Sequence, residues 1–208
     1  LGFAHEYIDP RRSGIPVGID IGNDLSYLGI LRSEFRESGR LVTWWSTAYD
    51  GMPLLGHPNT QAFYPPLILP CLAFGTEVGT RIAYVFSLLL AGGGMYFFTR
   101  LLGPRPLLAL WAGLLFAMNG GLIARIHAGH LQKVLAIPYI PLVLGCAMLV
   151  GRAKSRRWLL FWALATGLLH GLTFLAGDTY VPLFLLFAVA IILAAGVRQY
   201  EEILSWKV

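Results

Sequence analysis

Five long apolar runs constrain the fold of this chain more than any other feature of its sequence. Each contains 17 to 22 residues, and a helix of that length is roughly 25–33 Å long, which matches the hydrocarbon core of a bilayer. Because a chain in lipid must satisfy its own backbone hydrogen bonds, such runs are expected to be helical. The sequence therefore predicts an all-α polytopic membrane protein. The five runs are Val78–Thr99, Leu107–Arg125, Val134–Val150, Trp158–Ala176 and Val181–Val197.

The composition supports the membrane prediction and excludes an ordinary soluble domain. Of the 208 residues 56% are hydrophobic and 13% are charged, and the mean hydropathy is +0.64. From residue 78 onward eleven basic residues face only three acids, but the basic residues are scattered between apolar runs. This distribution of basic residues indicates the orientation of the chain in the membrane rather than a nucleic-acid-binding surface, and we expect no nucleic-acid partner. Cys71 and Cys146 lie in no metal-ligand spacing, and we expect no disulfide between them.

The basic linkers predict the orientation of the chain. Two linkers between the runs are basic: Arg100–Pro106 carries two basic residues and Gly151–Arg157 carries four. The order of the spans places both linkers on the same side of the membrane, and the positive-inside rule predicts that this side is cytoplasmic. Residues 1–77 then form an outer loop region, residues 78–197 a five-helix transmembrane region, and residues 198–208 a cytoplasmic tail. The expected location is the bacterial inner (plasma) membrane. Glycines at 92–94, 167 and 171 predict close helix packing.

The outer region contains one amphipathic segment that could lie on the bilayer surface. After Asp24, apolar residues recur on one helical face, and Gly39 is expected to end a helix of about three turns. The apolar positions are Leu25, Leu28, Leu31 and Phe35. Asp24 stands where an N-cap is expected, since its carboxylate can accept the free backbone N–H groups. A chemical role for the same carboxylate is the alternative.

The segment Trp44–Pro66 is rich in aromatic residues and prolines and shows neither helical nor strand periodicity, so it predicts an ordered loop. Amphipathic aromatic side chains are typical of membrane–water interfaces and also stack against sugars. The loop is therefore either an interfacial anchor or the rim of a substrate site. The candidate ligand-contacting residues in it are Trp44, Trp45, Tyr49, Asp50, His57, Gln61 and Tyr64.

Several charged residues lie near the predicted outer boundary. Arg81, Arg125 and Lys133 either snorkel to lipid phosphates or converge on a bound phosphate. Asp178 occupies the tip of an apolar hairpin, where it is either a helix cap or a chemical group.

The histidines predict contacts rather than a metal site. His127 and His130 share a face if their helix is continuous, but a zinc site would need a third ligand that the sequence does not single out. We therefore expect hydrogen-bonding histidines there, and a packed, hydrogen-bonded His170 inside the fourth span.

Three segments together resemble a known family. They are GND-LSYLGILRSEFRESGRL, W-x4-DGMPLLGHPNTQAFYPP and RIHAGHLQ-x5-PYIPLVL. Over roughly residues 15–195 the chain resembles the N-terminal membrane part of the bacterial YfhO-like proteins of the GT-C glycosyltransferase superfamily. Relatives carry a G-H-P-Q-like turn where this chain reads GDTY at Gly177–Tyr180.

The resemblance implies transfer of a sugar from a polyprenyl-phosphate carrier to an acceptor outside the membrane. By position, Asp24 matches the acid near the start of the family's outer loop, and His130 matches the histidine of its A-G-H segment. Asp24 and Asp178 are then the candidate catalytic acids, Arg81, Arg125 and Lys133 bind phosphate, and His130 joins the aromatic loop in binding the sugar. The sequence leaves any cofactor unknown, and it neither requires nor excludes a divalent metal with Asp24 as a ligand. Membrane lipids and the lipid-linked sugar are the expected partners.

Two other functions compete with the transferase. A non-catalytic scaffold or accessory subunit of a larger membrane complex would keep the fold, and the GDTY turn favours it. A transporter is favoured by the glycine-interrupted spans, but the sequence shows no inverted repeat. Because the sequence has no initiator Met and lacks the first and the later helices of relatives, we expect it to be part of a longer protein or to pack against the helices of other membrane subunits.

Overall fold

The chain is folded almost entirely as helices in the computed structural model, which describes residues 19–40, 43–45, 51–54 and 57–205, with side chains up to Gly196. The elements are α2 Ile19–Ser38, β1 Trp44–Trp45, β2 Met52–Pro53, η1 Pro58–Thr60, α3 Pro65–Phe74, α4 Thr76–Leu101, α5 Pro106–Ala117, α6 Gly120–Ala128, α7 Leu131–Ala136, η2 Ile137–Tyr139, α8 Ile140–Gly151, α9 Arg156–Leu175 and α10 Tyr180–Ser205. The all-α prediction is confirmed.

Four helical segments are long and apolar enough to cross a membrane: Thr76–Leu101, Pro106–Ala128, Leu131–Gly151 and Arg156–Leu175. They correspond to the first four predicted spans. The fifth, Tyr180–Gly196, is apolar but shorter within the residues whose side chains are described. The helix itself does not stop at residue 197, because α10 continues to Ser205 and takes in most of the predicted tail.

Two of these segments are not single helices. Asn119 separates α5 from α6, and its Oδ1 accepts the Leu122 backbone N–H at 2.8 Å, so it caps the second helix. Pro138 and Pro141 interrupt the third segment, where a short 3₁₀ turn joins α7 to α8. Proline lacks the N–H of a continuous helix, which explains why a run that reads as one span is built from three pieces.

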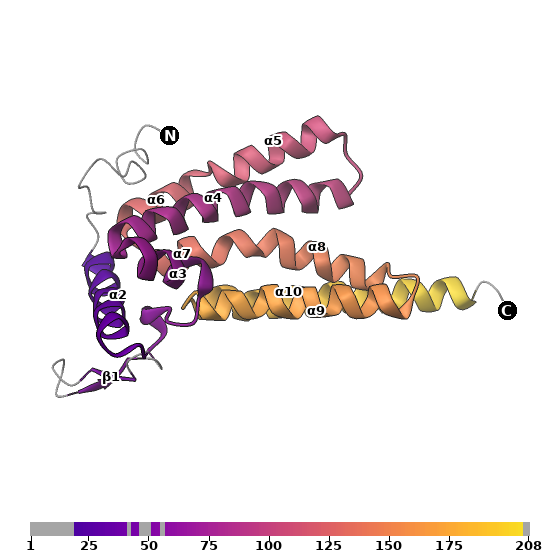
Figure 1. Cartoon of the computed structure of the whole chain (residues 1–208). Helices are drawn as coiled ribbons and strands as arrows, with labels where there is room; N and C mark the ends of the chain where they lie inside the picture. Colours follow the sequence, from indigo (N-terminus) through magenta and orange to yellow (C-terminus); the bar gives the residue numbers. More distant parts are fainter. Residues whose placement is uncertain (1–18, 41–42, 46–50, 55–56, 206–208) are drawn as a thin grey trace.

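The helices form two groups that meet at one end of the bundle (Figure 1). The α4–α5 hairpin forms one group, and α8, α9 and α10 form the other. Helix α2 lies across the end where α3, the α6–α7 junction and the α9–α10 turn are found, and we call this the α2 end. The α4–α5 and α8–α9 turns lie at the opposite end, called the α8–α9 end, and Arg152 there donates to the Leu101 carbonyl at 2.9 Å. The predicted grouping of the linkers is therefore correct.

Helix α2 is longer than predicted. It begins at Ile19 rather than at Leu25, and it ends at Ser38 before Gly39, which has the expected positive φ of +68°. The buried face contains Leu28 and Leu31 as predicted, and Ile21 and Asp24 in addition. Asp24 therefore lies inside the helix, and the N-cap interpretation is wrong.

Small residues bring α4 and α5 together. A Cβ on Gly113 would lie only 2.6 Å from the Gly92 carbonyl oxygen, so the two backbones touch at this crossing. The predicted packing role is confirmed for Gly92 and for Gly94, whose Cβ would lie 2.9 Å from Leu142 Cγ, but it is wrong for Gly93, where a Cβ would meet nothing within 4 Å. A Cβ on Gly167 or Gly171 would likewise meet nothing within 4 Å, and the packing prediction for these two glycines is wrong.

Between α2 and α3 the described residues include one short pair of strands and the 3₁₀ turn η1. β1 and β2 pair as an antiparallel ribbon, with Trp44 opposite Pro53 and Trp45 opposite Met52. Two-residue strands leave no periodicity to read, which is why the sequence indicated only a loop. The prolines at 65 and 66 begin α3, whose ten residues are too short to span, as expected.

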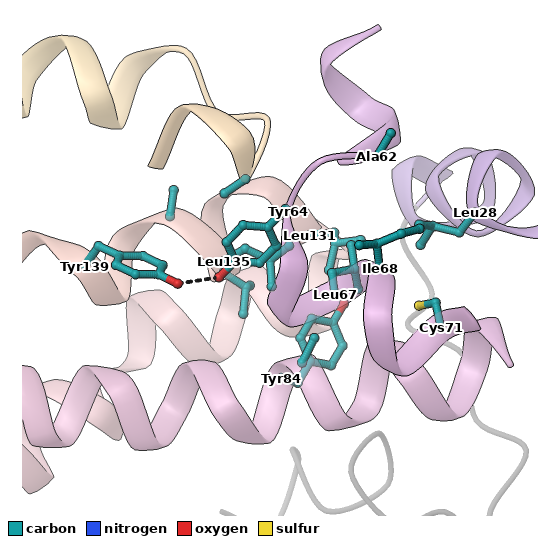
Figure 2. Packing of buried hydrophobic residues seen from close by; sticks show 14 of the residues in the cluster. Leu28, Ala62, Tyr64, Leu67, Ile68, Cys71, Tyr84, Leu131, Leu135 and Tyr139 are labelled. Atoms are coloured by element: carbon teal, nitrogen blue, oxygen red, sulfur yellow. Dashed lines mark hydrogen bonds between the residues drawn. The ribbon is translucent and has the colours of Figure 1, made fainter. Parts of the chain in front are cut away.

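The best-packed part of the molecule lies near the α2 end (Figure 2). Tyr64, at the start of α3, is fully buried, and its hydroxyl is 3.0 Å from that of Tyr139. Leu131 and Leu135 of α7 pack in the same cluster, and Leu28 carries it to α2. Cys71 and Cys146 are both free and buried, so the absence of a disulfide between them is confirmed.

Candidate functional site

A buried carboxylate at the α2 end is the centre of the candidate site. Asp24 has no exposed surface, and Gln132 donates from Nε2 to both of its carboxylate oxygens at 3.1 Å. The pKa of Asp24 is raised from 3.8 to about 7, chiefly because burial disfavours the charged carboxylate. The neighbouring charge of Asp20 also raises this pKa, and its effect is larger than the opposing effect of the Gln132 hydrogen bonds. A carboxyl group that titrates near neutrality can take up and release a proton under physiological conditions.

A second acid lies one turn earlier on the same face of α2. Asp20 Oδ2 is 3.5 Å from His130 Nε2, and these two side chains are 61% and 40% exposed. The contact is an ion pair when the imidazole is protonated and a weak polar contact when it is neutral. Asp20 and His130 are therefore the solvent-accessible members of a cluster whose buried member is Asp24. We call Asp20, Asp24, His130 and Gln132 the α2 clasp, because they join α2 to the α6–α7 junction.

Gly129 gives the junction the shape that the clasp requires. Its φ is +77°, it ends α6, and a Cβ at this position would lie 2.9 Å from the Ile21 Cβ. Glycine adopts this left-handed conformation without strain and lets α2 approach closely. Because α6 ends at Ala128, His127 and His130 lie on no common helical face, and that prediction is wrong.

Tyr84 contributes a buried hydroxyl beside the clasp. It lies on α4, is 1% exposed, and is near enough to Asp24 to interact with it electrostatically. Its hydroxyl has no hydrogen-bond partner among the described residues. Figure 2 shows the ring packed next to Leu67 in the core.

Asp178 is tied into the structure by both of its carboxylate oxygens. Oδ1 accepts the backbone N–H groups of Tyr180 and Val181 at 2.9 and 2.7 Å, so the carboxylate caps the start of α10. Oδ2 lies 3.5 Å from Lys133 Nζ, which also sits 5.1 Å from the centre of the Tyr180 ring. The cap interpretation of Asp178 is confirmed, and Lys133 has its counter-charge within the protein.

The other two cations occupy different places. Arg81 is buried in the wall of an apolar groove of about 620 Å³ between α3 and α4, and Phe74 and Val85 also line that groove. Arg125 is partly exposed on α6. None of the contacts among described residues brings Arg81, Arg125 and Lys133 together, so their convergence on one phosphate stays a prediction.

The aromatic loop divides into exposed and buried members. Trp44 is 54% exposed, whereas Trp45 packs edge-on against Tyr27 of α2 with ring centres 5.8 Å apart. His57 lies 5.2 Å from the same tyrosine ring, and its Nδ1 accepts the Asn59 backbone N–H at 3.3 Å. Trp45 and His57 thus pack on Tyr27 of α2.

Two members of the loop face the protein interior. Gln61 and Tyr64 are buried, and burial with the nearby Tyr139 raises the Tyr64 pKa far above its usual value. These two side chains do not offer surface to a ligand. Tyr49 and Asp50 lie outside the described residues.

Metal and histidine chemistry are limited in the part of the chain that the structure describes. There no group of three or more His, Cys, Asp or Glu side chains is placed to hold a metal ion. His170 packs edge-on against Phe174 at 5.3 Å, as expected, but its Nδ1 has no hydrogen-bond partner among the described residues. The packing part of that prediction is confirmed, and its hydrogen-bonding part stays a prediction.

Sequence reasoning assigned no role to Asp20, Gln132 or Tyr84. A signal for the burial of Asp24 was present, because Ile21, Asp24, Leu28 and Leu31 recur at helical spacing and place an acid within the apolar face. Starting the predicted helix at Asp24 concealed this pattern. Gln132 and Tyr84 have no local signal, since each acts only through a contact between distant segments.

The chain matches no protein-family model, no curated protein and no solved structure with which we compared it.

Proposed function

We propose that this protein is a membrane glycosyltransferase of GT-C type, which transfers a sugar from a polyprenyl-phosphate carrier to an acceptor at the α2 end of the bundle. The observation that carries the proposal is the α2 clasp, with a buried acid that titrates near neutrality behind an exposed acid–imidazole pair. Positioned groups of this kind supply general acid–base catalysis. The α2 end would face outward, since the basic linkers lie at the other end.

The groove at Arg81 supports a lipid-phosphate donor. It meets a second apolar hollow of about 460 Å³ at Leu89, which continues between α4 and α5 as far as Tyr96. Along α4, Val78 and Tyr96 are roughly 27 Å apart at 1.5 Å per residue. A polyprenyl chain could follow this path, with its phosphate near Arg81, where a guanidinium would stabilise the charge of the leaving phosphate.

The roles within the clasp follow from exposure. Asp20 and His130 can contact an acceptor hydroxyl directly. One of them would take the hydroxyl proton while the acceptor oxygen bonds to the sugar carbon and the bond between that carbon and the carrier phosphate breaks. Asp24 has no exposed surface, so an acceptor would reach it only after α2 moves from the α6–α7 junction. The exposed Trp44 and the partly exposed Trp45 could stack on a sugar. Asp178 and Lys133 would support the site without contacting substrate.

A non-catalytic scaffold or accessory role is the second candidate, and one observation favours it. The candidate acids already have protein partners: Asp24 has Gln132, Asp20 has His130, and Asp178 has Lys133 and the first turn of α10. Contacts of this kind hold helices together without any chemistry.

The test is donor consumption by purified protein in proteoliposomes. A panel of polyprenyl-phosphate hexoses is supplied, and released polyprenyl phosphate is measured for the wild type, Asp20→Asn and Asp24→Asn. We expect each variant to lose about 10²–10⁴-fold in rate if its carboxylate is the base. Glu34→Gln is the matched control, because it removes an acid from an exposed position on the same helix.

Melting temperatures of all variants show that loss of rate is not loss of fold. Full turnover in both Asn variants would remove the clasp from the mechanism. A wild-type protein that consumes none of the donors would favour the scaffold role.

A further inference from the structure

The α8–α9 end carries cations that the described protein does not neutralise. Lys154, Arg156 and Arg157 are exposed, and none of them makes a hydrogen bond or ion pair with a described residue. The sequence holds no acid anywhere between Glu77 and Asp178. Both arginines also lie in the first turn of α9, where the positive end of the helix dipole disfavours cations. An external anion would relieve this local excess of positive charge.

A hollow next to these cations has the shape of a binding site. It encloses about 550 Å³ and is lined by Ser155, Arg157, Trp158 and Phe161. Phe161 packs edge-on against Trp158 and Trp162, and the two indoles stack at 6.4 Å. Trp158 and Phe161 are nevertheless exposed to the surroundings of the protein. Aromatic residues in this position are typical of the level of lipid headgroups.

An exposed apolar stripe leads away from the hollow along the same face of α9. Arg157, Phe161, Leu164 and Leu168 follow one another at spacings of four, three and four residues, and Leu164 and Leu168 are 73% and 69% exposed. From Arg157 to Leu168 the helix rises roughly 17 Å. This is close to the depth of one leaflet, since the hydrocarbon core is about 30 Å thick.

We propose that this surface binds one anionic phospholipid of the bilayer, with its phosphate at Arg157 and an acyl chain along Leu164 and Leu168. Guanidinium groups bind phosphate oxygens through two parallel hydrogen bonds, and Arg156 and Lys154 add charge to the same headgroup. Basic pockets at the membrane boundary are suited to anionic lipid headgroups. Charge complementarity selects an anionic lipid over a zwitterionic one, because no acid among the residues whose side chains are described pairs with these cations or could balance a choline or ethanolamine group. The site does not depend on the proposed transferase.

The experiment measures lipid retention by native mass spectrometry. Purified protein in detergent is titrated with phosphatidylglycerol and with phosphatidylcholine of identical acyl chains. We expect the wild type to retain phosphatidylglycerol in clear preference, and Arg157→Gln to lower that retention roughly fivefold, the effect of one basic residue near a charged lipid surface. Arg105→Gln is the control, since it removes an exposed cation from the other turn at the same end. It should leave retention unchanged.

The acyl stripe is tested separately from the headgroup. Inorganic phosphate and a short-chain phosphatidylglycerol are added as competitors, and both should compete poorly with the long-chain lipid. Equal retention of the two headgroups, equal loss in Arg105→Gln, or full competition by inorganic phosphate would overturn the proposal. The last outcome would mean a site for a soluble anion.

Discussion

The two ends of the bundle differ in how their charged side chains are paired and exposed. At the α2 end, acids on α2 and in the α9–α10 turn contact His130, Gln132 and Lys133, and two of those acids are buried. At the α8–α9 end, the cations of the α8–α9 turn are exposed and lack charged partners among the described residues. The first arrangement joins helices that are distant in sequence, whereas the second leaves charge available to the surroundings.

The contrast follows from the cost of burying charge. A buried carboxyl group is tolerated when it is hydrogen-bonded or protonated, and Asp24 has a hydrogen bond from Gln132 as well as a raised pKa. An exposed lysine or arginine at a membrane boundary keeps its hydration and needs no partner. We therefore expect substitutions to change the stability of the protein strongly at the α2 end and only slightly at the α8–α9 end. Four predictions test this difference, in order of decreasing effect.

The largest expected effect is the pH dependence that Asp24 contributes. Its pKa is about 7 in the folded protein and 3.8 otherwise, so the folded state binds a proton more tightly. This group therefore makes the protein less stable as pH rises from about 4 to 7, and the loss, on the order of 4 kcal/mol, levels off above pH 7. Thermal unfolding in detergent between pH 4 and pH 8 measures it.

Asp24→Asn should remove that component and raise stability at pH 8, because the amide has a similar shape and no charge. An Asn variant that is less stable than the wild type at pH 8 would contradict the burial argument. Combined with loss of turnover, a gain in stability would distinguish a catalytic acid from a structural one.

Gly129→Ala is the second prediction. The substitution places a Cβ in a left-handed conformation and within 2.9 Å of the Ile21 Cβ. We expect a loss of about 2–3 kcal/mol from backbone strain and the displaced contact with α2. The control is Gly167→Ala in α9, where a Cβ meets nothing within 4 Å and helix propensity favours alanine by up to about 1 kcal/mol. Equal melting temperatures for the two variants would show that α2 does not depend on this approach.

Asp178→Ala is expected to cost about 1–2 kcal/mol, since the first turn of α10 loses its cap and Lys133 loses its counter-charge. Asp178→Asn separates these contributions, because asparagine caps a helix about as well as aspartate does. Most of the stability should return in the Asn variant, as Lys133 is partly solvated. Chemical denaturation of both variants in detergent provides the comparison, and an Asn variant as unstable as the Ala variant would assign the effect to the ion pair.

The smallest effect is expected at the opposite end. Arg105→Gln and Lys154→Gln remove exposed cations without contacts to described side chains, and each should change stability by less than about 0.5 kcal/mol. The measurement is the same unfolding experiment. A loss above 1 kcal/mol in either variant would mean that this end also depends on its charges.

Much of the fold was determined by local sequence. The length and apolarity of the runs predicted the four long helical segments, and Gly39 marked the end of α2 as expected. The spacing of the linkers placed the two basic turns at one end. These features depend on periodicity, backbone conformation and charge, which a chain carries in neighbouring residues.

Tertiary structure alone decided the candidate site. Asp24 becomes a buried group with a raised pKa because distant segments pack around it, among them Gln132, 108 positions away. Asp178 gains Lys133 as its counter-charge because α7 reaches the α9–α10 turn. Tyr64 is likewise buried beside Tyr139, 75 positions away. A pattern in sequence identifies which residues are polar or aromatic, but desolvation and pairing depend on what packs against them. That information exists only once distant segments meet.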